Sequence, residues 1–305
     1  MLLNTYNLLS TNLTYHIPKD IDNDERTDRI IHALDTTEGI ICCQEVCQTL
    51  YSKMRNLNGK KAIIGYKNKG MGEVIIYDRT KYELLKSYAF RPSEFMEPIE
   101  LLPVSNSFFS LPTWFGGEDG KKESEKYNKD ATKISNSKRM MTLCQFKKIN
   151  NNANNNNDVN DVVFWVCNVH VPCMFWRSDF MWNFIYAAFT KTKEYVSQFD
   201  SEDATIFFCG DFNMARKDHD DEVQQMLQDF NMFDLTKNAG NTINTYTERS
   251  GHFCDQIDYI FSNKEFVDYF PSKNYMSDED VLSVMPNNIS PSDHCLLTVQ
   301  INDKI

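Results

Sequence analysis

Short apolar runs alternate with amphipathic segments along the chain, which is typical of a protein that combines strands and helices. Residues 1–8 alternate between two faces and predict a strand whose polar face ends at Asn7. Residues 24–34 carry acids early and apolar side chains at helical spacing, so a helix is expected there. A buried strand over 40–43 then ends just before Glu45.

The rest of the chain predicts the same two kinds of element. Strands are expected over 61–66, 72–77, 82–90, 140–148, 162–170, 205–210, 242–246, 256–261 and 294–301. Helices are expected over 46–57, 177–199 and 218–230. Two stretches lack either pattern. Residues 91–138 are rich in Pro, Gly and charge and are expected to be an irregular insertion, and the Asn-rich residues 150–161 a flexible hairpin tip.

Length and charge narrow the picture. A chain of 305 residues that is 41% hydrophobic and has no linker is expected to form one domain over 1–305. The net charge of -11 argues against general electrostatic capture of nucleic acid. A polyanionic substrate would therefore need a metal ion or a local basic patch, and residues 120–139 offer seven Lys and Arg against three acids.

Cysteine usage bears on the compartment. The nine cysteines lie mostly in apolar runs and show no Cys-x-x-Cys spacing, which suits a reducing compartment better than a disulfide framework. No apolar run approaches membrane-spanning length, and the first residues lead directly into a strand pattern. The expected location is the cytoplasm, with no membrane partner.

Polar or titratable residues recur where apolar strands stop. They are Asn7, Glu45, His170, Asp211 with Asn213, and Asp293 with His294, and Asp258 lies inside a further strand. A buried carboxylate such as Asp258 is costly unless paired, and a hydrogen bond to a histidine would satisfy it. Each residue alone has a structural explanation, as a helix-start acid, a turn residue or a core histidine. Together they are a suitable inventory for one hard divalent cation with proton-transfer groups.

Six short motifs also follow one another in a recognisable order. They are Thr5–Ser10, Gln44–Val46, Asn168–His170, Gly210–Asn213, Ile257–Ile260 and Ser292–His294. This set resembles the signature of the exonuclease-endonuclease-phosphatase superfamily, which includes deoxyribonuclease I-like nucleases, abasic-site endonucleases, deadenylases, inositol polyphosphate 5-phosphatases and neutral sphingomyelinases. The resemblance implies an α/β fold, a four-layer α-β-β-α sandwich of two packed mixed sheets, with one cleft at an edge.

The resemblance also implies a metal site. Glu45 would bind Mg²⁺ or Mn²⁺, Asn7 would lie beside it in the metal and phosphate site, and Asp293 would lie near the metal. These are oxygen ligands of the kind that hard cations prefer.

The catalytic roles are likewise implied by the resemblance. Asp211 would orient or deprotonate the attacking water, helped by Asn213. His294, held by Asp258, would stabilise the phosphate oxygens, and His170 would donate from the other side. A phosphodiester needs such a positioned water and such donors for its non-bridging oxygens.

The start of the chain resembles one branch most. Thr5–Ser10 and residues 24–30 and 41–46 look like the deadenylase and nocturnin-like branch, whereas His252–Gln256 lacks the Trp and Arg of the inositol 5-phosphatase motif. The expected function is a Mg²⁺-dependent phosphodiesterase acting on single-stranded RNA as a 3′ exonuclease. The alternatives are an inositol phosphate or phospholipid headgroup as substrate, a DNA-repair endonuclease, or a scaffold without activity.

Three residues are candidates for substrate binding. Lys138 and Arg139 enter a strand at the end of the basic segment, and the aromatic Trp176 follows the His170 strand. Trp176 could stack on a base or pack its helix onto the sheet. Glu73 could hydrogen-bond a catalytic histidine or be an ordinary edge-strand residue.

Overall fold

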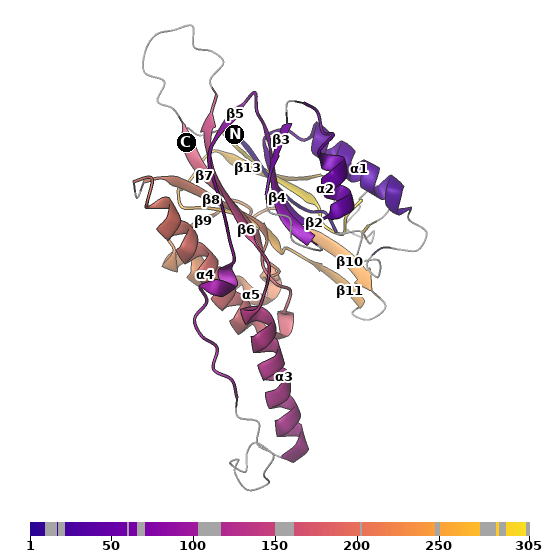
Figure 1. Cartoon of the computed structure of the whole chain (residues 1–305), viewed down its shortest axis with the longest axis vertical. Coiled ribbons are helices and arrows are strands. Elements are labelled where there is room, and N and C mark those ends of the chain that lie inside the picture. Colours follow the sequence, from indigo (N-terminus) through magenta and orange to yellow (C-terminus); the bar gives the residue numbers. More distant parts are fainter. Residues whose placement is uncertain are drawn as a thin grey trace.

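Two six-stranded sheets form the centre of this computed structural model, and helices cover their outer faces (Figure 1). The structure describes residues 1–9, 17, 22–59, 61–65, 71–102, 117–149, 162–201, 203–247, 251–274, 285–286 and 291–302. The predicted α/β sandwich of two mixed sheets is confirmed.

The first sheet has the order β13-β14-β1-β2-β4-β3. Its strands are β1 (Leu2–Asn7), β2 (Ile40–Cys47), β3 (Lys61–Ile64), β4 (Met71–Asp78), β13 (Tyr269–Asn274) and β14 (Leu296–Ile301). The second sheet has the order β5-β6-β7-β8-β12-β9. Its strands are β5 (Tyr82–Phe90), β6 (Met141–Lys148), β7 (Val163–His170), β8 (Thr205–Asp211), β9 (Phe233–Asp234) and β12 (Asp258–Ser262).

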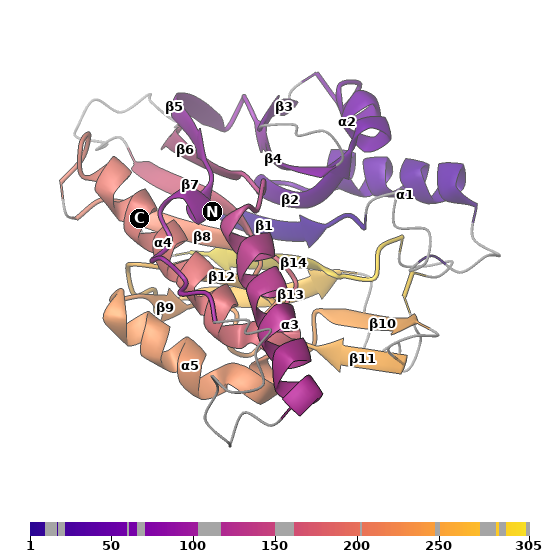
Figure 2. The ribbon, with the colours of Figure 1, turned by 60° about the horizontal axis from the view of Figure 1, so that its bottom comes forward.

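One central pair in each sheet is parallel, β1 with β2 and β7 with β8, and the other neighbours are antiparallel. The carboxyl ends of parallel strands share one edge of a sheet, which is where sheet enzymes place their sites. A separate hairpin of β10 (Ile243–Thr247) and β11 (Gly251–Asp255) lies toward the end to which β1 points (Figure 2).

Alternation along the strands produces the layers. Side chains such as Ile40 and Cys42 of the first sheet and Phe164 and Phe207 of the second form a shared core between the sheets. The outer face of the first sheet packs against α1 (Asn23–Thr36) and α2 (Gln48–Met54). The outer face of the second sheet packs against α4 (Ser178–Val196) and α5 (Arg216–Asp229).

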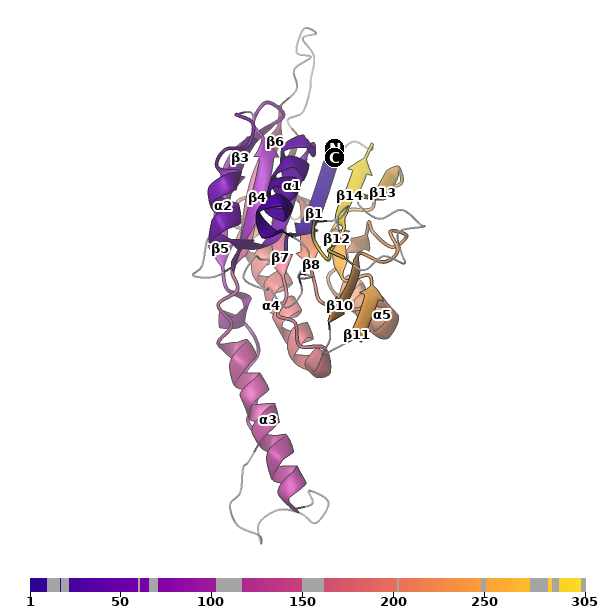
Figure 3. The same cartoon turned by 90° about the vertical axis from the view of Figure 1, so that its right-hand side faces the viewer.

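One element departs clearly from the sequence expectation. Residues 117–135, expected to be irregular, form the 19-residue helix α3 (Gly117–Ser135), which projects beyond the sandwich (Figure 3). Its Lys and Glu residues favour helix, and the single narrow stripe that includes Ala131 and Ile134 is enough to pack its end onto the core. The expected Asn-rich tip at 150–161 lies outside the described residues.

Smaller differences also occur. β2 continues through Glu45 to Cys47, so α2 begins two residues later than expected and is short. The sequence pattern missed the two-residue β9, and also β11 and β13, in which apolar and polar residues do not alternate. Among the described helices, none is long and apolar enough to cross a membrane.

Candidate active site

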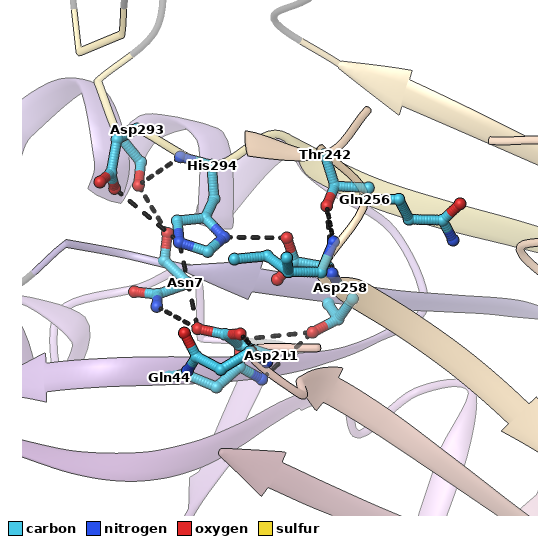
Figure 4. A network of polar contacts seen from close by, with 12 residues as sticks. Asn7, Gln44, Asp211, Thr242, Gln256, Asp258, Asp293 and His294 are labelled. Carbon is cyan, nitrogen blue, oxygen red and sulfur yellow. Dashed lines mark hydrogen bonds and ion pairs between the residues drawn. The ribbon is translucent and has the colours of Figure 1, made fainter. Parts of the chain in front are cut away.

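Strand register gathers the predicted residues at one edge of the sandwich. In the second sheet, Asp211 at the end of β8 is paired with His170 of β7 on one side and Asp258 of β12 on the other. In the first sheet, Asn7 ends β1. Its amide Nδ2 donates to Asp211 Oδ2 at 3.0 Å and so joins the two sheets (Figure 4).

Gly210 makes the close approach of β7 and β8 possible. A Cβ at this position would lie 1.9 Å from the carbonyl oxygen of Val169, which no side chain can tolerate. Only glycine therefore lets the two strands pair where Asp211 meets His170.

A bulge in β2 directs Glu45 toward the same edge. The register of β2 against β4 shifts between Cys43 and Val46, and Glu45 has a φ of 57°. This left-handed backbone is costly for a residue with a side chain, and such strain is typical of functional sites. The Oε1 atom of Glu45 lies 3.9 Å from Nε2 of His170.

Asp211 is the centre of the site. It is 2% exposed, its Oδ2 accepts from Asn7, and its Oδ1 accepts from the backbone N–H of Asn213 at 2.8 Å. Burial and the nearby charge of Asp258 raise the pKa of Asp211 to about 7, although His294 opposes this. A carboxylate with a pKa near neutrality is well suited to accept a proton from water.

His294 is held as a cation. Its Nδ1 lies 2.8 Å from Asp258 Oδ2, and its Nε2 lies 4.0 Å from both Asp211 and Asp293. Burial opposes the charged form, but the carboxylates of Asp258, Asp293 and Asp211 outweigh it and raise the pKa of His294 to about 10. The ring therefore presents an N–H donor at the edge of the site.

His170, in contrast, is neutral. Burial, with the positive charges of Arg139 and His294, holds its pKa well below the usual value, so the ring is neutral. Its Nε2 is 3.6 Å from Asp211, and its Nδ1 is 3.5 Å from Oε1 of Glu73. Burial raises the pKa of Glu73 to about 8, so this acid is largely protonated at neutral pH. Glu73 thus lies against a site histidine, but His170 Nδ1 has no hydrogen-bond partner among the described residues, so the hydrogen bond suggested from sequence stays a prediction.

Several polar residues that sequence reasoning missed support this site. Thr242 Oγ1 accepts from the backbone N–H of Asp258 at 3.1 Å, and its carbonyl accepts from Cys295 N at 2.8 Å (Figure 4). Gln44 Nε2 donates to Asn168 Oδ1 at 2.7 Å between the sheets. Gln44 and Asn168 both belonged to recognised motifs, whereas nothing in the sequence marked Thr242.

Arg26 is a second unpredicted support. This fully buried guanidinium donates to the carbonyls of Leu8, Leu9 and Pro291 at 3.2, 2.8 and 2.8 Å. It ties the segment after Asn7 to the one that carries His294. Its Nε also donates to the side-chain Oδ1 of Asn23 at 3.3 Å, and its three bonds to backbone carbonyls clamp the two segments together.

The donor set fits a hard divalent cation. Among the described residues, no three His, Cys, Asp or Glu side chains form a complete metal cage. Mg²⁺ normally binds through one or two carboxylates, with water and substrate phosphate completing its shell. Glu45, at the rim with its carboxylate 12% exposed, and the buried Asn7 match that mode, with Asp293 4% exposed nearby.

The structure places the three substrate-binding candidates differently. Lys138 is exposed and Arg139 is half-buried. Arg139 lies close enough to His170 and Glu73 to affect both pKa values. Trp176 is 54% exposed rather than packed into the core.

The endonuclease/exonuclease/phosphatase family model matches residues 5–294, which is nearly the whole chain. The chain belongs to this family. Members are metal-dependent phosphoesterases and nucleases, so the predicted superfamily and enzyme class are confirmed. No curated protein sequence matches the chain significantly.

Solved structures show the same fold. The endonuclease/exonuclease/phosphatase from Bacteroides vulgatus is 17% identical over 98% of each chain, with a TM-score of 0.60. The mannosyl-6-phosphatase Bt3783 of Bacteroides thetaiotaomicron is 15% identical over 99% of each chain, with a TM-score of 0.61. TDP2 from D. rerio, complexed with a single strand DNA product, is 11% identical over 99% of each chain, with a TM-score of 0.59.

Proposed function

We propose that this family member hydrolyses phosphodiester bonds in single-stranded nucleic acid, with RNA as its substrate, as a 3′ exonuclease of the deadenylase type. The observation that carries the proposal is that Asp211 lies between two histidines, of which His294 is positively charged and His170 is neutral. A proton acceptor, a cationic donor and a neutral donor then face the same small volume. This combination is what in-line attack of water on a phosphodiester requires.

Asp211 is the proton acceptor in this mechanism. Hydrogen bonds from Asn7 and from the backbone of Asn213 fix both of its oxygens. The Asn213 side chain donates to the carbonyl of Val171 at 2.9 Å, which holds this turn in place. Water attacks phosphorus, its proton passes to Asp211, and the bond to the leaving nucleoside oxygen breaks.

The two histidines stabilise the phosphate oxygens. His294 offers a charged Nε2–H because Asp258 holds the other nitrogen. His170 is neutral, and in the tautomer that carries its proton on Nε2 it offers an N–H to the phosphate. Donors that are in place before the reaction avoid reorganisation as negative charge develops.

Glu45 and Asn7 would hold Mg²⁺ or Mn²⁺, with Asp293 near it. Bound there, the cation would neutralise charge on the scissile phosphate.

The substrate choice has separate support. The TDP2 structure contains a single strand DNA product, which makes a single-stranded nucleic acid a fitting ligand for this fold. The motifs at Thr5–Ser10 and at residues 41–46 favour RNA and the deadenylase type. All nine cysteines are free thiols, which supports a reducing compartment such as the cytoplasm.

A substrate panel tests the proposal. Single-stranded RNA, single-stranded DNA, abasic duplex DNA, an inositol polyphosphate and mannose 6-phosphate are each incubated with Mg²⁺ or EDTA. We expect shortening of the RNA from its 3′ end with Mg²⁺ and none with EDTA. Release of phosphate from the inositol or sugar phosphate with the RNA left intact would overturn the proposal.

A matched pair of variants tests the metal residue. Glu45→Gln should lower kcat/KM on RNA by at least ~100-fold, because it removes the charged ligand. Glu38→Gln removes an exposed carboxylate elsewhere and should leave activity unchanged. Equal activity of the two variants would contradict the assignment of Glu45.

A further inference from the structure

Helix α3 carries a row of lysines along one face. Lys122, Lys126, Lys129 and Lys133 are spaced by four, three and four residues, and all four are exposed. Such spacing puts them on one side of a helix. At 1.5 Å per residue, the row is roughly 16 Å long. We call these four residues the lysine face.

The lysine face ends at an exposed tryptophan. Lys133 Nζ lies 5.8 Å from the centre of the Trp176 ring. The ring nitrogen of Trp176 donates to Asp130 Oδ2 at 2.8 Å, and Asp130 is buried. The indole is therefore held by its edge on α3, while 54% of the residue stays exposed.

Short segments connect this end of α3 and Trp176 to the strand that carries His170. Strand β6 begins at Met141, six residues after α3 ends at Ser135, and its Thr142 pairs with Asn168 of β7. Asn168 lies two residues before His170, and the short turn of helix Phe175–Arg177, which contains Trp176, begins five residues after His170. The α3 end and Trp176 therefore both adjoin the end of β7 that carries the site.

Charge complementarity indicates which ligand would bind to the lysine face and Trp176. The whole chain has a net charge of -11, so its general surface repels a polyanion. The exposed row of cations on α3 is where such a chain can be held. Inorganic or sugar phosphates would use the charges alone, whereas an open indole beside them matches a strand with unpaired bases.

We propose that the lysine face of α3 and the indole of Trp176 bind the single-stranded segment that adjoins the scissile phosphodiester. Trp176 stacks on one base, and the lysines contact the phosphates that follow. This inference rests on the proposed function for the position of the scissile bond, but binding can be measured without catalysis.

The first test measures binding of a fluorescently labelled single-stranded RNA in EDTA by anisotropy. Base stacking on an aromatic ring is worth about 1–3 kcal/mol, so Trp176→Ala should raise Kd by roughly 5- to 150-fold. Trp176→Phe keeps a stacking ring and should stay within about threefold of wild type. Phe270→Ala removes a ring of similar exposure, 59%, on β13 and should leave Kd unchanged. Equal Kd values for wild type and Trp176→Ala would overturn the proposal.

The second test addresses the lysines. Each phosphate contact contributes about 0.7 to the slope of log Kd against log salt for single strands. Lys126→Gln with Lys129→Gln should therefore reduce the slope by ~1.4. Lys53→Gln with Lys81→Gln removes the same charge from two other surface sites. An equal change of slope in both double variants would mean that only the overall charge of the protein matters, and would overturn the role of the lysine face.

Activity separates this inference from the proposed function. If RNA is cut and Trp176→Ala changes neither Kd nor KM, the inference alone fails. If RNA is not cut but Trp176→Ala still weakens its binding, the proposed function fails and the inference stands. Binding of duplex RNA as tight as that of single strands would contradict stacking by Trp176.

Discussion

The charge state of His294 depends on one carboxylate, and replacing it gives a sharp prediction. Asp258→Asn keeps the shape of the side chain but removes the charge 2.8 Å from His294 Nδ1. In the variant, only Asp293 and Asp211 still favour the imidazolium, and burial opposes it. The pKa of His294 should fall from about 10 to the ordinary value near 6.5 or lower.

The size of the effect follows from these values. At pH 8, a histidine with a pKa of about 10 is ~99% protonated, whereas one with a pKa of about 6.5 is only ~3% protonated. If the cation is the active form, kcat/KM at pH 8 should drop by at least ~30-fold. Asp258 raises the pKa of Asp211, but the charge of His294 lowers it by more, and the variant loses both effects; the acid limb should therefore not move below pH 7.

The assay is kcat/KM on RNA from pH 5.5 to 10.5 at constant ionic strength. Wild type should gain activity as Asp211 ionises near pH 7 and lose it as His294 deprotonates near pH 10. In Asp258→Asn the basic limb should fall to lower pH while the acid limb stays near pH 7 or above, so the optimum narrows and the maximum rate drops. A uniform loss with unmoved limbs, in a variant that melts like wild type, would refute the role of Asp258.

Other predictions concern the supports of the site. Glu73→Gln should stabilise the fold relative to wild type, and increasingly so as pH rises from 4.5 to 9, which urea titrations measure. The pKa of Glu73 near 8 in the folded protein means that wild type loses unfolding free energy over this pH range, whereas the variant does not. A difference in unfolding free energy between variant and wild type that stays constant across pH would contradict this. Gly210→Ala should cost at least ~2 kcal/mol because its Cβ meets the carbonyl of Val169, whereas Gly59→Ala, with nothing within 4 Å, should cost under ~0.5 kcal/mol. Equal costs would refute that contact. Arg26→Lys should lower the melting temperature and kcat together, since an ammonium cannot span three carbonyls; unaltered melting would refute the clamp.

Strand ends could be predicted from sequence because a residue at the end of an apolar run belongs to the edge of a sheet. Asp211 and His170 are examples, and their pairing follows from parallel strands of similar length. The order of the motifs then indicated the family, and membership of that family predicts that residues as far apart in sequence as Asn7 and His294 share one site. The pairing of Asp258 with a histidine also followed, because a buried carboxylate needs a partner.

The features that escaped prediction depend on tertiary contacts. Sequence pattern ended β2 before Glu45, because a bulge with positive φ is set by the neighbouring strands rather than by local propensity. Helix α3 was missed because its apolar stripe is narrow and its charges look like those of a loop. Thr242 and Arg26 act through backbone groups of other segments, which no local pattern reveals.

The central claim is that one cluster at the edge of the sandwich, with Asp211 at its centre, performs phosphodiester hydrolysis. The direct measurement is kcat/KM of Asp211→Asn on single-stranded RNA with Mg²⁺, together with its melting temperature. We predict a loss of ~10³-fold or more with melting equal to or above that of wild type, since the variant loses a catalytic base and a costly buried charge. Retained activity, or a collapsed melting temperature, would contradict the account.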